Sequence, residues 1–294
     1  MTFLRWPPSK TTAILVGSLL VAIVLFASTS LVLTAWMVRA AVLSVLALAG
    51  LWWARRLQHR WLRWCTATTA ALLFAAAVAV LAYAIALAAG DRSPRVMDLG
   101  GGLTYERIAI DEPHRQVFHV AVVDLDNPCV GLTTTRPGPG GVVQAETGTA
   151  FVERTGVALS INAAFFYPFV EYPFWAATES GDEMIAMGTV VINGRWLGDV
   201  GRGGNNGLAL TDGRLSAADI PADADFAVRG RAVLVAGGQS VAPDSPAYAR
   251  SVVGVDLDTN SLVLVVSDGK QPGYAEGSTY GQVAEFLVAM GVDE

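Results

Sequence analysis

Acidic residues are absent from the first 90 positions of this 294-residue chain. Those positions carry seven Lys or Arg residues and no Asp or Glu. The remaining 204 residues carry 13 basic and 26 acidic residues, so a net charge near +7 is followed by one near −13. Long apolar sequence without acidic groups is typical of membrane-spanning helices. The charge break therefore predicts a membrane anchor over residues 1–90 and places the chemistry in the residues that follow it.

The predicted anchor contains three uncharged runs, at residues 11–38, 40–54 and 64–90. A membrane helix needs about 20 mostly apolar residues. We expect two tightly connected spans within residues 11–54, with a turn near 28–30, and a third span over 65–89. Arg39 then lies within the second span, which is costly unless its side chain snorkels or faces another helix. A two-span alternative treats 11–38 as one long tilted helix and 40–54 as an interfacial piece.

Basic residues predict the orientation of this anchor. Arg5 and Lys10 precede the first apolar run, and a short loop carries Arg55, Arg56, Arg60 and Arg63. Short basic loops stay in the cytoplasm. Three spans place both basic clusters there and the C-terminal domain outside, whereas two spans leave one cluster on the wrong side. A cleaved signal peptide fits poorly, because the apolar run is too long and further spans follow. We predict a multi-pass protein of the cell membrane, in contact with the lipid bilayer, with an extracytoplasmic C-terminal domain.

Residues 91–102 are interpreted as a linker and residues 103–294 as one domain of ordinary size. Short runs rich in Val, Ile and Leu, bounded by turn residues, predict strands at 117–125, 130–135, 157–163, 188–193, 207–211, 231–236, 250–257 and 261–267. The turn residues at 256–261 indicate a hairpin. Helical spacing predicts helices over about 142–155 and from Ser278 or Thr279 onward. The predicted fold is an α-helical transmembrane anchor of three spans followed by an α+β, strand-rich soluble domain.

Several classes of function lack support in this sequence. The acidic balance argues against nucleic acid as a partner, because phosphate backbones require a basic surface. No Walker loop, dinucleotide fingerprint or nucleophile elbow is present. Cys65 and Cys129 have no neighbour at metal-ligand spacing, and the His residues at 59, 114 and 119 are scattered, so we expect no metal site, no cofactor and no disulfide. His114 and His119 are interpreted as ordinary loop and strand residues.

The first candidate segment for binding is Asn162-Ala163-Ala164-Phe165-Phe166, at the end of a predicted apolar strand. An Asn amide both donates and accepts, which suits a sugar hydroxyl or a phosphate oxygen. The plainer interpretation is an Asn that bonds its own turn, with the two Phe side chains in the core. Seven aromatic residues fall between Phe165 and Trp175. They predict a platform for a glycan, a packed loop or a surface resting on the bilayer.

The second and third candidates lie in the last 45 residues. Arg250 begins one strand of the predicted hairpin and Asp268-Gly269-Lys270 ends the other, so Arg250 and Asp268 are predicted to face one site. Arg suits bidentate capture of phosphate, although a surface ion pair beside a turn has the same pattern. The third candidate is the segment 277–287, in which a Gly-rich loop runs into a predicted helix. The first amides of this helix favour an anion, as those of any capped helix do.

In order and spacing, these segments resemble the phosphodiester glycosidase family over about residues 105–294. The family has Asn-Gly-Gly-Phe-Phe where this chain has residues 162–166, and Gly-x-Val-x-x-x-Gly is matched by 188–194. Ala-Arg-(Ser/Thr)-x-x-Gly is matched by 249–254, Asp-Gly-(Arg/Gln) by 268–270, and the family's Gly-rich helix by 277–287. The chain departs from the family at Ala163, Ala164 and Gln282, which replace Gly, Gly and Glu. It ends at Glu294, before an Asp-Gly-Gly-Gly-Ser loop of the family, so we expect a C-terminally incomplete domain.

The resemblance implies hydrolysis of a sugar-1-phosphodiester, with a carbohydrate phosphodiester as the substrate. In this hypothesis Asp268 is the general acid or base and Glu276 is its reserve. Arg250, with the helix that begins at Thr279, holds the phosphate, and Asn162 orients a sugar hydroxyl. Gly269, Lys270, Phe165 and Phe166 complete the predicted substrate-binding set. The alternative is a non-catalytic glycan-binding or polysaccharide-export module, and a third, weaker option places the function in the membrane helices.

Overall fold

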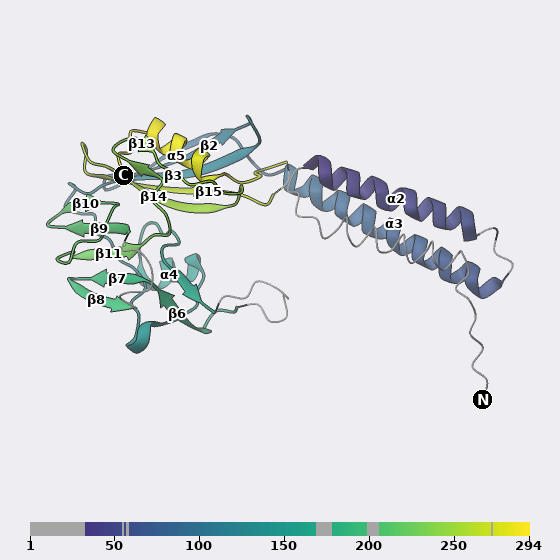
Figure 1. Ribbon diagram of the computed structural model, residues 1–294, viewed down its shortest axis with the longest axis horizontal. Helices are drawn as coiled ribbons and strands as arrows, with labels where there is room; N and C mark the ends of the chain where they lie inside the picture. The colour runs from purple at the N-terminus through teal and green to yellow at the C-terminus, as the bar shows by residue number, and fades with distance from the viewer. Residues whose placement is uncertain (1–32, 55, 57–58, 169–177, 199–205, 272) are drawn as a thin grey trace. The chain divides into compact units, whose positions relative to one another are not determined.

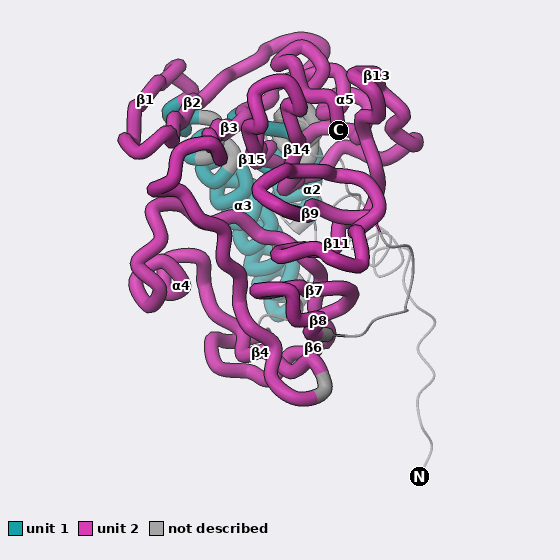
Figure 2. Tube along the Cα trace, turned by 90° about the vertical axis from the view of Figure 1, so that its left-hand side faces the viewer, with its two compact units in different colours: residues 1–91, 270–276 teal, residues 92–269, 277–294 magenta. Residues whose placement is uncertain are grey.

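The computed structural model describes residues 33–54, 56, 59–168, 178–198, 206–271 and 273–294 (Figure 1). The chain divides into two compact units (Figure 2). The first comprises Met1–Asp91 together with Lys270–Glu276. The second comprises Arg92–Gly269 together with Gly277–Glu294. The charge break in the sequence thus falls at the boundary between the two units.

The first unit contains two apolar helices, α2 (Leu33–Ala54) and α3 (Arg60–Ala88). They pack through buried Leu43 and Ala77. A Cβ atom on Gly50 would lie 3.4 Å from the Cβ of Ala70, so small residues let the two helices approach closely. Arg63–Tyr83 is the one described helical stretch long and apolar enough to cross a membrane, judged by length and a mean hydropathy of 2.1 alone. The first predicted span lies outside the described residues, so the three-span anchor stays a prediction.

The second unit is strand-rich, as predicted, and its main sheet has five strands. Their order is β1 (Arg95–Gly100), β2 (Leu103–Ile110), β3 (Gln116–Asp124), β15 (Ser261–Ser267) and β14 (Arg250–Asp256), each antiparallel to its neighbours. Strands β14 and β15 pair in register from Arg250↔Ser267 to Asp256↔Ser261, which confirms the predicted hairpin.

Alternation along these strands gives the main sheet two buried faces. On one face Val120 and Val265 pack against Val283 and Leu287 of helix α5 (Tyr280–Ala289). The Phe118 ring stacks on Phe286 of that helix, with centroids 4.2 Å apart. On the other face a second cluster joins Ala121, Val123, Val255 and Leu262 to side chains of a second sheet, namely Leu208, Leu215, Phe226 and Val228. The main sheet therefore lies between α5 and the second sheet.

The second sheet also has five strands, in the order β10 (Arg214–Ser216), β9 (Gly207–Thr211), β11 (Phe226–Arg229), β7 (Thr189–Ile192) and β8 (Arg195–Gly198). A smaller sheet pairs β4 (Val142–Gln144), β6 (Glu183–Met187) and β5 (Phe165–Tyr167). Strands β12 (Val235–Ala236) and β13 (Gln239–Ser240) form a two-stranded ribbon. The short helices are η1 (Pro139–Gly141) and α4 (Gly148–Thr155).

Four predicted elements differ from the observed ones. Residues 130–135 and 157–163 form no strand. Val130, Leu132 and Leu159 are apolar because they cover the cluster between the two large sheets, not because they pair in a ladder. The predicted helix over 142–155 divides into β4 and α4, because Thr147 caps α4 and Ala145 N–H donates to Asp182 O. Of the predicted strand 231–236, only Val235–Ala236 is a strand.

Candidate active site

A chain of three polar side chains crosses the main sheet at the end of β15. Asp268 directly follows this strand, and its backbone N–H donates to Val117 O at 3.0 Å. Its Oδ2 atom lies 3.0 Å from Nε2 of His119 on β3. On the far side of the imidazole, Nδ1 of His119 lies 2.8 Å from Oη of Tyr105 on β2. Strand pairing thus brings together a carboxylate, an imidazole and a phenol that are far apart in the sequence.

This chain of contacts can hold or move a proton. A neutral His119 that donates from Nε2 to Asp268 can accept the Tyr105 hydroxyl hydrogen at Nδ1. A carboxylate that fixes an imidazole in this way also stabilises the protonated ring. The side chains of His119 and Asp268 are 29% and 25% exposed, so both are within reach of a ligand. Residue types, geometry and access therefore suit general acid–base chemistry.

Sequence reasoning missed His119 and Tyr105. The prediction that His119 is a plain strand residue rested on its distance from other polar groups in the sequence, whereas its partner Asp268 lies 149 residues away. The usable signal was the alternation in β3, which places His119 on the same face as Ala121 and Val123. A polar side chain on a face that is otherwise apolar needs a partner.

Arg250 and Asp268 lie on opposite faces of the main sheet. Arg250 is paired with Ser267, which is paired in turn with Phe118, and directly opposite residues point to the same face. His119 is paired with Val266, one position further along β15, so it points to the other face with Asp268. The strand ends approach each other as predicted, but the two side chains diverge.

The guanidinium of Arg250 is bound within the protein. Its Nε donates to Ser278 O at 2.8 Å and its Nη2 to Ser245 Oγ at 3.0 Å. Its Cζ lies 3.9 Å from the centroid of the Tyr280 ring, a cation–π contact. Arg250 thereby fixes the segment that begins α5. A contact between Arg250 and a substrate phosphate remains a prediction.

The start of α5 is closed by protein groups in the same way. Thr279 Oγ1 accepts from Gln282 N–H, and Gln282 Oε1 accepts from Thr279 N–H, a capping box. Tyr280 N–H donates to Ser245 Oγ at 2.7 Å. Gln282 therefore has a structural use at the position where the family has Glu. These three amides already have acceptors, so a substrate phosphate would compete with the cap.

Replacing Thr279 with Ala is expected to lower the free energy of unfolding by about 1 kcal/mol, because the cap hydroxyl is lost. Thr279→Ser keeps the hydroxyl and is expected to stay close to the parent. The apparent Tm from circular dichroism of the full chain measures both effects. An unchanged Tm for Thr279→Ala would show that the cap does not stabilise α5.

The other predicted binding residues lie outside this chain of contacts. Asn162 is exposed in an irregular segment before β5. Neither Ala163 nor Ala164 takes a positive φ, so Ala fits the backbone at these described positions. Phe165 and Phe166 are 53% and 41% exposed on β5. Of the remaining predicted aromatic segment, residues 169–175 lie outside the described residues.

Three further predicted residues follow Asp268 in the sequence. A Cβ atom on Gly269 would lie 2.4 Å from the backbone N of Ala249, so glycine is needed for this close approach. Lys270 and Glu276 belong to the first unit, and their roles stay predictions. Within the described residues, no group of three or more His, Cys, Asp or Glu is arranged to hold a metal ion.

Residues 155–294 match the family model described as Phosphodiester glycosidase. This part of the chain is similar to the phosphodiester glycosidase family. The match confirms the resemblance drawn from the motifs and supports a glycosidase-type hydrolase. Asp268 lies within the matched segment, whereas Tyr105 and His119 precede it.

Comparison with solved structures found a similar protein, titled "Crystal structure of a hypothetical protein from Synechocystis", with 13% identity and a TM-score of 0.43. The alignment covers 69% of this chain and 57% of the Synechocystis chain. A search of curated proteins found no match.

Proposed function

We propose that this protein hydrolyses sugar-1-phosphodiester bonds in glycans or in wall or exopolysaccharide polymers, releasing the sugar and leaving a phosphomonoester. The observation that carries the proposal is the contact of 3.0 Å between Asp268 Oδ2 and His119 Nε2. Asp268 belongs to the Asp-Gly motif of the family segment, and its partial exposure leaves it accessible to substrate.

In the proposed reaction, water attacks the anomeric carbon while the bond from that carbon to the phosphate oxygen breaks. Asp268 takes the proton of the attacking water, and His119, held at its other nitrogen by Tyr105, stabilises the charge on the carboxylate. Most glycosidases need a second acid, because a sugar alkoxide is a poor leaving group. A phosphomonoester is a much weaker base, with a second pKa of about 6. One carboxylate–imidazole pair is therefore a sufficient minimal set.

The second candidate function is binding of an anionic glycan without hydrolysis. Two sets of donors were predicted to hold the substrate phosphate, the Arg250 guanidinium and the first amides of α5. Both already have acceptors within the protein, which favours this second function. The exposed Phe165 and Phe166 rings suit stacking against sugar faces in either case.

For the location, we propose a multi-pass anchor in the cell membrane with the catalytic unit on the extracytoplasmic side. The proposal is supported by the apolar helical stretch Arg63–Tyr83 and by the basic residues that precede it. The positive-inside rule assigns those basic residues to the cytoplasm. A substrate in the wall or in exported polysaccharide lies on the opposite side.

The proposed function is tested by incubating the purified full chain, in detergent, with a panel of sugar-1-phosphodiesters and measuring free sugar and phosphomonoester together. Hydrolysis is expected to release the two products in equal amounts, and matched glycosides without phosphate are expected to stay intact. Saturable binding of a diester without product release would refute hydrolysis and support the second candidate function, binding alone. If the protein neither binds nor hydrolyses any diester of the panel, both proposed functions are refuted.

A further inference from the structure

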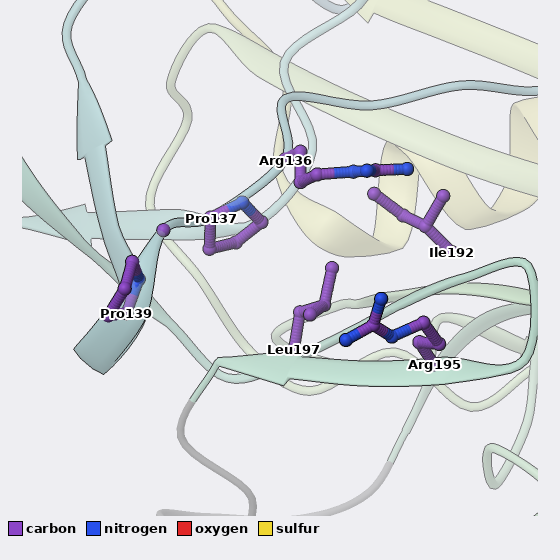
Figure 3. A pocket seen from close by; sticks show the side chains of 7 residues that line it. Arg136, Pro137, Pro139, Ile192, Arg195 and Leu197 are labelled. Atoms are coloured by element: carbon purple, nitrogen blue, oxygen red, sulfur yellow. The ribbon is translucent and has the colours of Figure 1, made fainter.

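A separate pocket lies between the segment around η1 and the β7–β8 hairpin (Figure 3). Its volume is about 270 Å³, close to the lower end of small-molecule sites. Its residues are Arg136, Pro137, Gly138, Pro139, Ile192, Arg195 and Leu197. None of them belongs to the chain of contacts at Asp268.

Two cations and no acid line this pocket. Figure 3 shows the Arg136 side chain along one side of the pocket. The Arg195 side chain lies on the other side and points toward it. Neither guanidinium has a hydrogen-bond acceptor or an ion-pair partner in the described part of the chain. Two other arginines of this unit are paired, Arg92 with Asp111 and Arg154 with Glu146.

Two guanidinium groups that share a pocket repel each other unless an anion lies between them. Residues 91–294 carry twice as many acidic as basic residues, so carboxylates are plentiful elsewhere in this part of the chain. The walls are apolar instead, formed by Pro137, Ile192 and Leu197, and Pro137 is buried. Arg136 and Arg195 are both exposed, so an anion can reach both guanidinium groups from solvent.

We infer that Arg136 and Arg195 form a binding site for a phosphate group carried by a saccharide. Guanidinium groups bind phosphate oxygens with paired, charge-assisted hydrogen bonds. The volume accommodates the phosphate and part of one attached sugar. The phosphate is argued from the two guanidinium groups alone, whereas the saccharide rests on the proposed function. Binding is measured without turnover, so failure of hydrolysis and failure of this site are distinguishable.

Isothermal titration of the full chain with inorganic phosphate and with a sugar-1-phosphodiester tests this site. Both measurements use the Asp268→Asn protein as background, so that hydrolysis does not consume the ligand. Arg136→Gln and Arg195→Gln are each expected to weaken binding by about tenfold, because charge-assisted hydrogen bonds are lost. Arg195→Lys keeps the charge but not the planar guanidinium, so it is expected to weaken binding of the diester by a smaller factor than Arg195→Gln does.

Arg214→Gln is the matched control, since Arg214 is an exposed arginine at the start of β10, outside the pocket. It is expected to change binding less than twofold, and circular dichroism of all variants reports folding. Tighter binding of the diester than of inorganic phosphate supports a saccharide ligand. Equal affinities for the diester and for inorganic phosphate would show that the site recognises phosphate alone and would overturn the saccharide part of the inference. Binding that is unchanged in both Gln variants, or absent from the parent, would overturn the inference.

Discussion

Asp268→Asn is expected to lower kcat for sugar release from a sugar-1-phosphodiester by at least about 100-fold, the usual contribution of a positioned general base. The amide cannot accept the proton of the attacking water. His119→Gln is expected to lower kcat as well, because the carboxylate loses its partner at 3.0 Å. Initial rates of sugar release, measured at several substrate concentrations, separate kcat from KM.

Asp258→Asn provides the control for this experiment. Asp258 is exposed in the turn between β14 and β15, so its substitution removes the same charge away from the proposed site. Its kcat is expected to equal that of the parent. Full activity of Asp268→Asn would remove Asp268 from the mechanism. Loss of activity in Asp268→Asn with an unaffected His119→Gln protein would keep the carboxylate and discard the imidazole.

Gly277→Ala is expected to lower the free energy of unfolding by about 3 kcal/mol, which is large for a single methyl group. Gly277 has a φ of 103°, which side chains with a Cβ rarely adopt. The added atom would lie 2.9 Å from backbone N and C of Tyr248. Tyr248 and Ser278 exchange two backbone hydrogen bonds at this point, so the backbone cannot move away without breaking them. Thermal unfolding should show a Tm lower by about 10 °C.

A matched substitution lies four positions further along the chain. Gly281 is in the first turn of α5, and a Cβ there meets only Thr279 Oγ1, at 3.9 Å. Gly281→Ala is therefore expected to raise the stability by about 0.5–1 kcal/mol, because Ala loses less entropy than Gly in a helix. Equal effects of the two Ala substitutions would show that the close approach at Tyr248 is not a constraint.

Much of the second unit could be predicted where local chemistry and burial agree. The β14–β15 hairpin has turn residues between two apolar runs, and α5 has both a Thr cap and helical spacing of Val283 and Leu287. The strands predicted at 130–135 and 157–163 were wrong, because an apolar run indicates burial and carries no information on pairing with a neighbouring strand. Both runs cover a cluster contributed by two different sheets, which no local pattern reveals.

The candidate site was predictable only in part. Asp268 could be predicted from its motif. The positions of His119 and Tyr105 beside it depend on the register of β2, β3 and β15, which the sequence does not reveal. The expectation that Arg250 faces the same site as Asp268 came from the nearness of two strand ends. Nearness leaves the direction of a side chain open, and a shift of one position along a strand reverses it.

This one-position difference has an evolutionary consequence. Arg250 and Ser267 share the side of the sheet that carries helix α5, while His119 and Asp268 occupy the reverse side. Selection for a well-docked helix and selection for turnover thus act on separate sets of atoms within a single ladder. Descendants of this domain can lose or retune the chemistry on one surface while the scaffold on the other is inherited unchanged.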